Sequence, residues 1–292
     1  MVGMTRPTVF ALALAAFSVV GLGSRGAAAL DLHVAPGGTG DGSAASPFGT
    51  IDAALGAASD GDRVVLHEGD YGDALLMGVF GSETTVVVAS GEQARFRSVE
   101  IRATHLTFRG ATVSLSYGDP YEARTMVTVH GSSESVTVAD CDIFSVTDGV
   151  AAGWGAADWA NLPSTGVSVR APDTTIANNR VRNVGHGISV AHDAPNAIVR
   201  GNHIDGFSRD GLRGIGDYGL FEYNVVRNAY DVDDHHDDFF QSWSVGADGT
   251  PGEGVVRGVV LRGNFFINFD DPARPFAGQA QGIGCFDGFF ED

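Results

Sequence analysis

The segment VRGNHI at residues 199–204 decides the fold, because it recurs along the chain without gaps. Each copy has an apolar residue, two variable residues, an asparagine, one variable residue and a second apolar residue. The copies are VADCDI at 138–143, with cysteine in place of asparagine, IANNRV at 176–181, VRGNHI at 199–204, FEYNVV at 221–226 and LRGNFF at 261–266. The asparagines Asn179, Asn202, Asn224 and Asn264 therefore follow one another at steps of 23, 22 and 40 residues.

This repeat predicts a coil of short strands. The segments alternate apolar and polar residues, which is the period of a β-strand, and glycine, asparagine and aspartate separate them. About 22 residues give three short strands and three turns, or one coil of a right-handed parallel β-helix whose coils stack about 4.8 Å apart. An asparagine at the same turn of each coil can form amide hydrogen bonds along the stack and tolerates a left-handed backbone. We therefore predict an all-β parallel β-helix with an asparagine ladder.

The two ends of the predicted solenoid differ. Near the N-terminus, Ile51, Ala54, Leu55 and Ala58 share one face of a short predicted helix that caps the first coil. At the other end, GFFED at 288–292 begins like another repeat and stops before its asparagine. We therefore expect residues 30–292 to form a single β-helix domain that is truncated at the C-terminus.

Residues 1–29 are typical of a secretory signal peptide. Arg6 precedes an apolar run at 9–22, and three alanines end the segment at 27–29. No other stretch is long and apolar enough to span a bilayer, so no membrane insertion is expected. The sequence thus predicts a secreted or periplasmic protein.

The charge of the chain limits its partners. It has 36 acidic residues against 18 basic ones, all of them arginine, and a formal net charge of −18. Such a surface disfavours nucleic acid as a partner. It would also repel a polyanion unless arginine or a bound cation offsets it locally. We expect a monomer.

The N-terminal sequence LHVAPGGTGDGSAASPFGTIDAALGAASDGDRVVLHEGDYGD, at 32–73, resembles the start of the pectate-lyase-like β-helix superfamily. With the asparagine column, the resemblance covers most of residues 30–290. It implies a secreted polysaccharide lyase, a uronan C5-epimerase or a glycoside hydrolase. The resemblance is specific for the fold and leaves the reaction open, because this fold carries several chemistries.

The acidic segment YDVDDHHDDFFQSW at 230–243 raises the question of where chemistry occurs. The turns that lead from the third strand of one coil into the first strand of the next align as STGV at 164–167, GHGI at 185–188, RDGL at 209–212, HDDF at 236–239 and AQGI at 280–283. This alignment places His186, Asp210 and Asp237 on consecutive coils, with Cα atoms roughly 5 Å apart. It also places Arg213 and Phe240 in a second, outward column, and Phe239 and Gln241 on the inward side.

Several side chains of this region suit an active site. Two carboxylates on adjacent coils raise the pKa of one of them, and His186, His235 and His236 add groups that titrate near neutral pH. Arg213 suits a uronate carboxylate, and Asp238 and Gln241 are further candidates for substrate binding. Each of these residues could instead have a purely structural role. His186 would form a hydrogen bond at a turn, Asp210 would cap its turn, the acidic segment would be a solvated loop, and Gln241 would be a buried amide.

Two other features point to ligands. Trp154 and Trp159 lie in an insertion at 150–163, where they either stack on sugar rings as exposed side chains or pack the insertion onto the solenoid. Asp233, Asp234 and Asp237 are oxygen donors that suit Ca²⁺, although nothing in their spacing fixes the coordination.

The resemblance also suggests roles. Uronan epimerases carry a Tyr-x-x-Asp-Pro-His motif, which Tyr230, Asp233 and His235 match, with Asp234 where proline is expected. The match implies His235 and Tyr230 as the acid/base pair and Asp233 as a group that neutralises or orients. We therefore expect C5-proton abstraction from a uronate in an acidic polysaccharide, by a lyase or an epimerase. The chain has no lysine, which excludes the lysine base that many such lyases use.

Two alternatives remain open. GHGISV at 185–190 is similar to the Gly-His-Gly motif of polygalacturonases, whose acidic pairs precede that motif, whereas Asp210 and Asp237 follow it here. Paired aspartates would still permit glycoside hydrolysis. A non-catalytic polysaccharide-binding rod is the other alternative, and it predicts uniform coils without a localised charged cluster.

Overall fold

The computed structural model describes residues 28–272, 276 and 278–292. Residues 1–27, which make up most of the predicted signal peptide, lie outside the described residues. Within the described part of the chain, no helix combines the length and the apolar character needed to cross a membrane.

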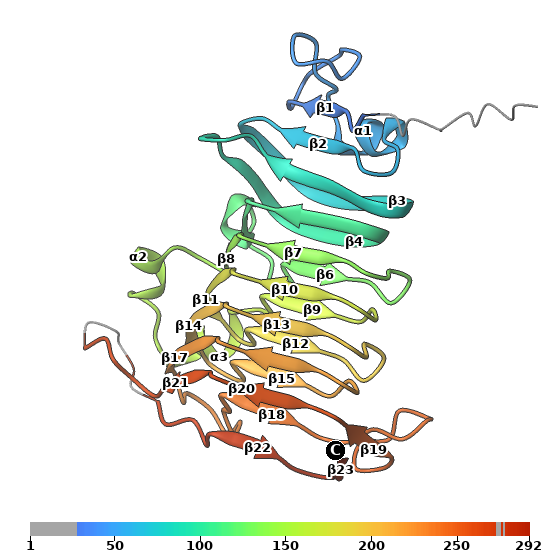
Figure 1. Cartoon of the computed structure of the whole chain (residues 1–292). Coiled ribbons are helices and arrows are strands. Elements are labelled where there is room, and N and C mark those ends of the chain that lie inside the picture. The colour runs from blue at the N-terminus through green and yellow to red at the C-terminus, as the bar shows by residue number, and fades with distance from the viewer. Residues whose placement is uncertain (1–27, 273–275, 277) are drawn as a thin grey trace, which may run out of the picture.

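In the described residues, 21 strands join into one continuous sheet of parallel strands, and this sheet winds into a stack of coils (Figure 1). The coils present three faces. Face 1 holds β7 (Thr137–Ala139), β10 (Thr175–Ala177), β13 (Ile198–Arg200), β16 (Leu220–Glu222) and β20 (Val260–Arg262). Face 2 holds β5 (Thr112–Ser114), β8 (Asp142–Phe144), β11 (Arg180–Val184), β14 (His203–Phe207), β17 (Val225–Ala229) and β21 (Phe265–Ile267). Face 3 holds β6 (Val127–Val129), β9 (Val167–Val169), β12 (Ile188–Val190), β15 (Leu212–Gly214), β18 (Phe240–Ser242) and β22 (Ile283–Cys285). The predicted parallel β-helix is confirmed.

The N-terminal coils are built from longer strands. β1 (Asp31–Val34) and β2 (Arg63–Leu66) precede β3 (Gly69–Val88) and β4 (Ala94–Arg109), which pair along most of their length and pass around the corners of the coil. Helix α1 (Ile51–Ala57) lies beside β1 and β2 at this end (Figure 1). The side chain of Thr50 accepts a hydrogen bond from the backbone N–H of Ala53, and α1 buries Ile51, Ala54 and Leu55. The predicted capping helix is therefore confirmed.

The asparagine ladder runs along the turn between face 1 and face 2. The amide oxygen of Asn202 accepts hydrogen bonds from the backbone N–H and the side-chain amide of Asn179, both at 3.0 Å. Its amide nitrogen donates to the carbonyl of Ile176 at 2.9 Å and to the amide oxygen of Asn224 at 3.0 Å. The ladder asparagines are not themselves left-handed. Instead the residue before each ladder asparagine has a positive φ, namely Asn178, Gly201, Tyr223 and Gly263, and so has Asp140 before Cys141.

The insertions gather at one corner, in the turns between face 2 and face 3, which we call the insertion corner. They include the 3₁₀ turn η1 (Leu115–Tyr117) and the helices α2 (Asp148–Ala151) and α3 (Ala156–Asn161). The acidic turn at 230–239 lies at the same corner, as do the described residues 268–272 and 278–282. Apart from the large sheet, β19 (Val255–Arg257) pairs with β23 (Phe289–Glu291).

The register of β18 differs from the prediction by one residue. Leu212 pairs with Phe240, and Arg213 pairs with Gln241, whereas the aligned turns had placed Leu212 opposite Phe239. The predicted outward Phe240 and inward Gln241 are therefore wrong. Phe240 is 1% exposed in the core, and Gln241 points outward from face 3 beside Arg213. A one-residue shift moves every side chain of a strand to the other face.

Candidate active site

The corrected register brings three polar side chains into one column at the start of face 3. The backbone N–H of Gly187 donates to the carbonyl of Asp210 at 2.9 Å, and that of Gly211 donates to the carbonyl of Asp238 at 2.8 Å. The column is therefore His186, Asp210 and Asp238 on consecutive coils. Asp237 lies one residue before this column, so its predicted place in it is wrong.

A pocket of about 170 Å³ opens at this column, across the coils of β12, β15 and β18. We call it the three-coil pocket. Its lining residues are His186, Arg209, Asp210, Arg213, Asp234, His235, His236 and Gln241. Seven of these eight were predicted as catalytic, substrate-binding or metal-ligating residues. Arg209 was not singled out, although it immediately precedes Asp210 in the aligned turn.

Arg213 is the centre of the polar contacts in this pocket. Its Nη2 donates to the carboxylate of Asp210, to Nε2 of His186 at 3.0 Å and to the amide oxygen of Gln241 at 3.3 Å. Its guanidinium carbon lies 5.0 Å from the ring centroid of Trp243. These contacts fix a cation in the pocket of a strongly acidic protein.

Trp243 was missed in the sequence. It lies two residues after Gln241, so strand alternation puts both side chains on the outward side of face 3 once the register is right.

His186 is held as a neutral imidazole. Burial, followed by the positive charges of Arg213 and Arg209, lowers the pKa of His186 to about 3. Since Arg213 donates to Nε2, the ring proton is on Nδ1. Burial also raises the pKa of Asp210, against the opposing effect of Arg213.

His235 is paired with Asp233 at the rim of the pocket. Its Nδ1 donates to Oδ1 of Asp233 at 2.7 Å, and its backbone N–H donates to the same oxygen at 3.0 Å. Partial burial raises the pKa of Asp233, but these two hydrogen bonds outweigh it and leave that pKa below its usual value. Because Nδ1 carries the ring proton, Nε2 keeps its lone pair. His236 lines the pocket too, and its ring lies 5.6 Å from that of Phe286.

Other predicted site residues are not in the pocket lining. Tyr230 is fully buried and packs on Trp159, with ring centroids 4.2 Å apart. Trp154 and Trp159 are 8% and 1% exposed, so both pack the insertion onto the solenoid, and Trp154 also lines a separate pocket. Asp238 is fully buried, and its Oδ2 accepts a hydrogen bond from Gln241 at 3.3 Å.

Asp237 and Asp238 are unusual buried carboxyls. Neither oxygen of Asp237 has a hydrogen-bond partner among the described residues. Burial, followed by the neighbouring Asp231 and Asp210, raises the pKa of Asp237 to about 8. Burial and Asp210 raise the pKa of Asp238 to about 6.

The Asp237 carboxyl should make stability depend on pH. The folded chain keeps this proton up to about pH 8, whereas the unfolded chain releases it near pH 3.8. The folded state therefore binds more protons in this window, and the free energy of unfolding falls as pH rises through it. Asp237→Asn should stabilise the protein more at pH 8 than at pH 5, by at least about 1.4 kcal/mol. Urea unfolding at both pH values measures this difference, and Asp193→Asn on an exposed turn is the control. Equal effects of Asp237→Asn at both pH values would contradict a buried, protonated Asp237.

The possible metal ligands do not converge. In the part of the chain that the structure describes, no group of three or more His, Cys, Asp or Glu side chains is arranged to hold a metal ion. Asp234 lines the pocket, Asp233 pairs with His235, and Asp237 is buried apart from both. Calcium at these three residues stays a prediction.

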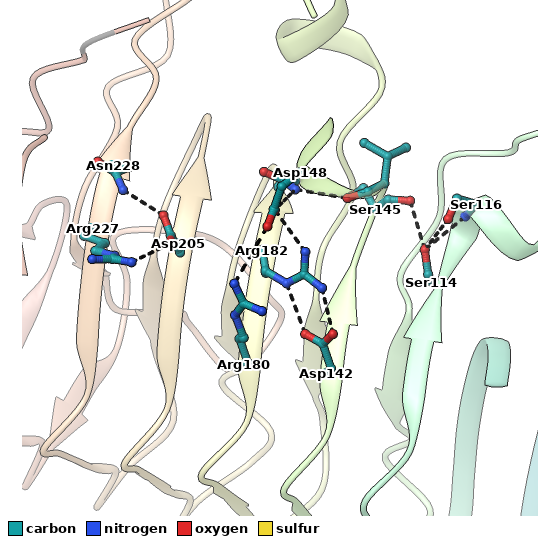
Figure 2. A network of polar contacts seen from close by, with 12 residues as sticks. Ser114, Ser116, Asp142, Ser145, Asp148, Arg180, Arg182, Asp205, Arg227 and Asn228 are labelled. Atoms are coloured by element: carbon teal, nitrogen blue, oxygen red, sulfur yellow. Dashed lines mark hydrogen bonds and ion pairs between the residues drawn. The ribbon is translucent and has the colours of Figure 1, made fainter. Parts of the chain in front are cut away.

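Ion pairs on face 2 hold the start of α2 against the solenoid, as Figure 2 shows. Arg182, which is 7% exposed, donates to Asp142 from Nε at 3.1 Å and from Nη2 at 2.7 Å. Its Nη1 donates at 2.9 Å to Asp148, the first residue of α2. The guanidinium carbon also lies 4.3 Å from the ring centroid of Phe144.

We expect Arg182→Met to loosen α2 and to cost about 2 kcal/mol of unfolding free energy. A fully buried pair would cost 3–5 kcal/mol, but the carboxylates of Asp142 and Asp148 are 35% and 47% exposed. The matched control is Arg180→Met, since Arg180 is half exposed and reaches Asp148 only at 3.8 Å. Urea unfolding and the rate of proteolysis within residues 148–161 measure the effect. If the two variants behave alike, the network does not anchor α2.

No protein-family model matches the chain, and no curated protein matches it. Three solved structures have a similar fold. Pectate lyase Pel9A is 13% identical, with 85% of this chain and 81% of that one covered and a TM-score of 0.48. An alginate lyase from Paenibacillus sp. str. FPU-7 is 13% identical, with 90% and 99% covered and a TM-score of 0.44. A rhamnogalacturonan lyase is 9% identical, with 86% and 87% covered and a TM-score of 0.42. These likenesses concern the fold, and they assign no residue a role.

Proposed function

We propose that the protein is a secreted carbohydrate-active enzyme that removes the C5 proton from a uronate residue of an acidic polysaccharide, as a lyase or a C5-epimerase. The observation that carries the proposal is the Asp233–His235 pair at the rim of a pocket that also holds Arg209 and Arg213. A base and a carboxylate-binding cation thus lie in one pocket.

Arg213 and Arg209 bind the uronate carboxylate in this proposal. Neutralising that carboxylate makes the adjacent C5 proton more acidic, because the negative charge left by its removal spreads onto the carboxylate. The carboxylate of Asp210 accepts a hydrogen bond from the Arg213 guanidinium, and the ring of Trp243 packs against that guanidinium. The protein's net charge of −18 would otherwise repel such a substrate, so these arginines offset the field locally.

His235 is the base in this proposal. Asp233 fixes the tautomer, so Nε2 of His235 accepts the C5 proton and the carboxylate stabilises the resulting imidazolium. In elimination, the C5 electron pair forms the C4–C5 double bond and the bond from C4 to its linking oxygen breaks. In this proposal His236, the other imidazole that lines the pocket, donates a proton to that oxygen. In epimerisation a proton returns to C5 from the opposite face instead. Tyr230 takes no part, because it is fully buried.

Hydrolysis is less well supported. A glycoside hydrolase needs two carboxyl groups on opposite sides of the scissile bond. Asp237 and Asp238 have the raised pKa of a general acid, but they are 4% and 0% exposed and do not line the pocket. Asp210 does line it and is committed to Arg213.

A panel of polymers tests the proposal. The purified protein is incubated with alginate, pectate and glycosaminoglycans. Absorbance near 232–235 nm reports elimination, and new reducing ends without absorbance report hydrolysis. Proton exchange at C5 without either reports epimerisation. No change on any polymer, with or without Ca²⁺, would favour the non-catalytic binding rod.

Three parts of the proposal have their own tests. Calcium dependence is tested by activity in EDTA, and no step above is routed through a metal ion. The secreted or periplasmic location is tested by fractionating cells that express the full chain. The monomeric state is tested by light scattering.

A further inference from the structure

A second, smaller hydrophobic cluster lies at the insertion corner, outside the core of the solenoid. Its buried members are Val146, Ala151, Trp154, Trp159 and Tyr230. Partly buried apolar side chains of the other insertions pack against it, among them Tyr121, Leu162 and Phe269. The hydroxyl of Tyr121 donates to the carbonyl of Leu162 at 2.8 Å, which joins the first two insertions. This cluster therefore gives turns from several coils a shared, packed structure.

A pocket of about 540 Å³ opens on this cluster between the first two insertions. Tyr121, Val150, Trp154 and Leu162 supply its apolar wall, and Ser116 and Asp119 add polar groups. Val150 is 52% exposed, so the wall is accessible. The volume lies within the range of small-ligand sites.

This pocket lies at the same corner as the three-coil pocket. The Tyr121 insertion precedes β6, and the turn with Asp210 precedes β15, three coils farther along face 3. At about 4.8 Å per coil, the two pockets are roughly 15 Å apart along the solenoid axis. A polymer lying along the axis would span both pockets, whereas a single sugar would not.

We propose that this pocket is a distal subsite for the same polysaccharide that the three-coil pocket acts on, which it binds by the apolar faces of sugar rings. The inference rests on the proposed function. Aromatic and aliphatic walls match the C–H face of a pyranose ring, and the hydroxyl and carboxylate at Ser116 and Asp119 match its hydroxyl groups. The lining carries no arginine, so it suits ring stacking better than carboxylate pairing.

The distal subsite also touches the catalytic turn through packed rings. Trp154 meets Trp159 edge-on at 5.1 Å, and Trp159 packs on Tyr230 at 4.2 Å. Tyr230 directly precedes the turn that carries Asp233 and His235. Binding energy gained at the distal subsite can therefore stabilise the conformation of the catalytic turn. Sugar binding there would raise kcat as well as lower KM.

Val150→Arg tests the inference, because it fills the pocket from an exposed position. We expect the ratio of kcat/KM on the polymer to kcat/KM on its shortest cleavable oligosaccharide to fall about tenfold, which corresponds to about 1.4 kcal/mol. The matched control is Val79→Arg on β3, 89% exposed and away from the insertion corner, which should leave the ratio unchanged. An unchanged ratio in Val150→Arg, with a normal melting temperature, would overturn the distal subsite.

Binding without turnover separates this inference from the proposed function. His235→Ala and the double variant His235→Ala/Val150→Arg are compared by affinity electrophoresis in gels that contain alginate or pectate. Weaker retention of the double variant supports the distal subsite even if the wild type turns over no polymer. Equal retention of the two variants, or no retention in any gel, overturns it whatever the activity of the wild type.

Discussion

His235→Ala is expected to lower kcat on the uronan substrate by about 10²- to 10⁴-fold, the usual contribution of a general base. KM should change little, because Arg209 and Arg213 still bind the carboxylate. The side chain of His235 is 55% exposed, and within the described part of the chain its one side-chain hydrogen bond goes to Asp233, so its removal should leave the fold intact. Initial rates at 235 nm and the melting temperature measure the two effects.

Two variants sharpen this prediction. His192→Ala removes an exposed histidine from the coil of β12 without touching the pocket, and it should keep full activity. Asp233→Asn should lower kcat less than His235→Ala does. It should also shift the pH–rate profile, because it removes the charge that stabilises the imidazolium. Full activity of His235→Ala would assign the base to another group.

Asn202→Ala is expected to cost about 4 kcal/mol of unfolding free energy. The substitution leaves the carbonyl of Ile176 and the backbone N–H of Asn179 without their ladder partners. Each buried polar group left unpaired costs about 1–3 kcal/mol. Asn202 is 1% exposed, so water cannot easily replace the lost hydrogen bonds. Urea unfolding followed by circular dichroism measures the loss.

The control for Asn202→Ala is Asn161→Ala, at the exposed end of α3. Among the described residues, the side chain of Asn161 makes one hydrogen bond, from its amide nitrogen to the carbonyl of Ala157. Its replacement should cost less than about 1 kcal/mol. Comparable losses in the two variants would mean that the ladder is not a main source of stability.

The ladder explains why the sequence predicts the fold so well. Asn179, Asn202 and Asn224 each form hydrogen bonds with the coils before and after them, and Asn264 bonds to the coil before it. The spacing of the asparagines in the sequence therefore reports the length of the coil. The aligned segments at Val138, Ile176, Val199, Phe221 and Leu261 pair with one another in register. The substitution of Cys141 for asparagine is also accommodated, since its backbone N–H still donates to Asn179 at 3.0 Å.

The site was harder to predict because two phenylalanines follow one another. Phe239 and Phe240 are both buried, at 4% and 1% exposure, so either could occupy the first core position of β18. Phe239 packs between Phe207 and Phe266, at the corner, and Phe240 fills the strand position against Phe221. The choice depends on contacts with neighbouring coils, which apolar periodicity alone does not contain.

The roles of the insertion residues were also beyond the sequence. An aromatic side chain in a turn can stack on a ligand or pack against another turn, and both uses favour the same residue types. Trp159 and Tyr230 are 71 positions apart in the sequence. Their turns belong to coils three steps apart in the stack, and the rings meet only because the fold brings these turns to the same corner. The residues that match the epimerase motif therefore have different surroundings. The ring of Tyr230 is buried, whereas Asp233 and His235 form a pair at the rim of the pocket.

The fate of the C5 proton tests the central claim most directly. The wild-type protein is incubated in D₂O with the polymer that it retains best, and the C5–H signal of the uronate is followed by proton NMR. We predict that the signal is lost, because elimination removes the proton and epimerisation replaces it with deuterium, and that His235→Ala preserves it. New reducing ends with the C5–H signal intact would contradict proton abstraction and would indicate hydrolysis instead.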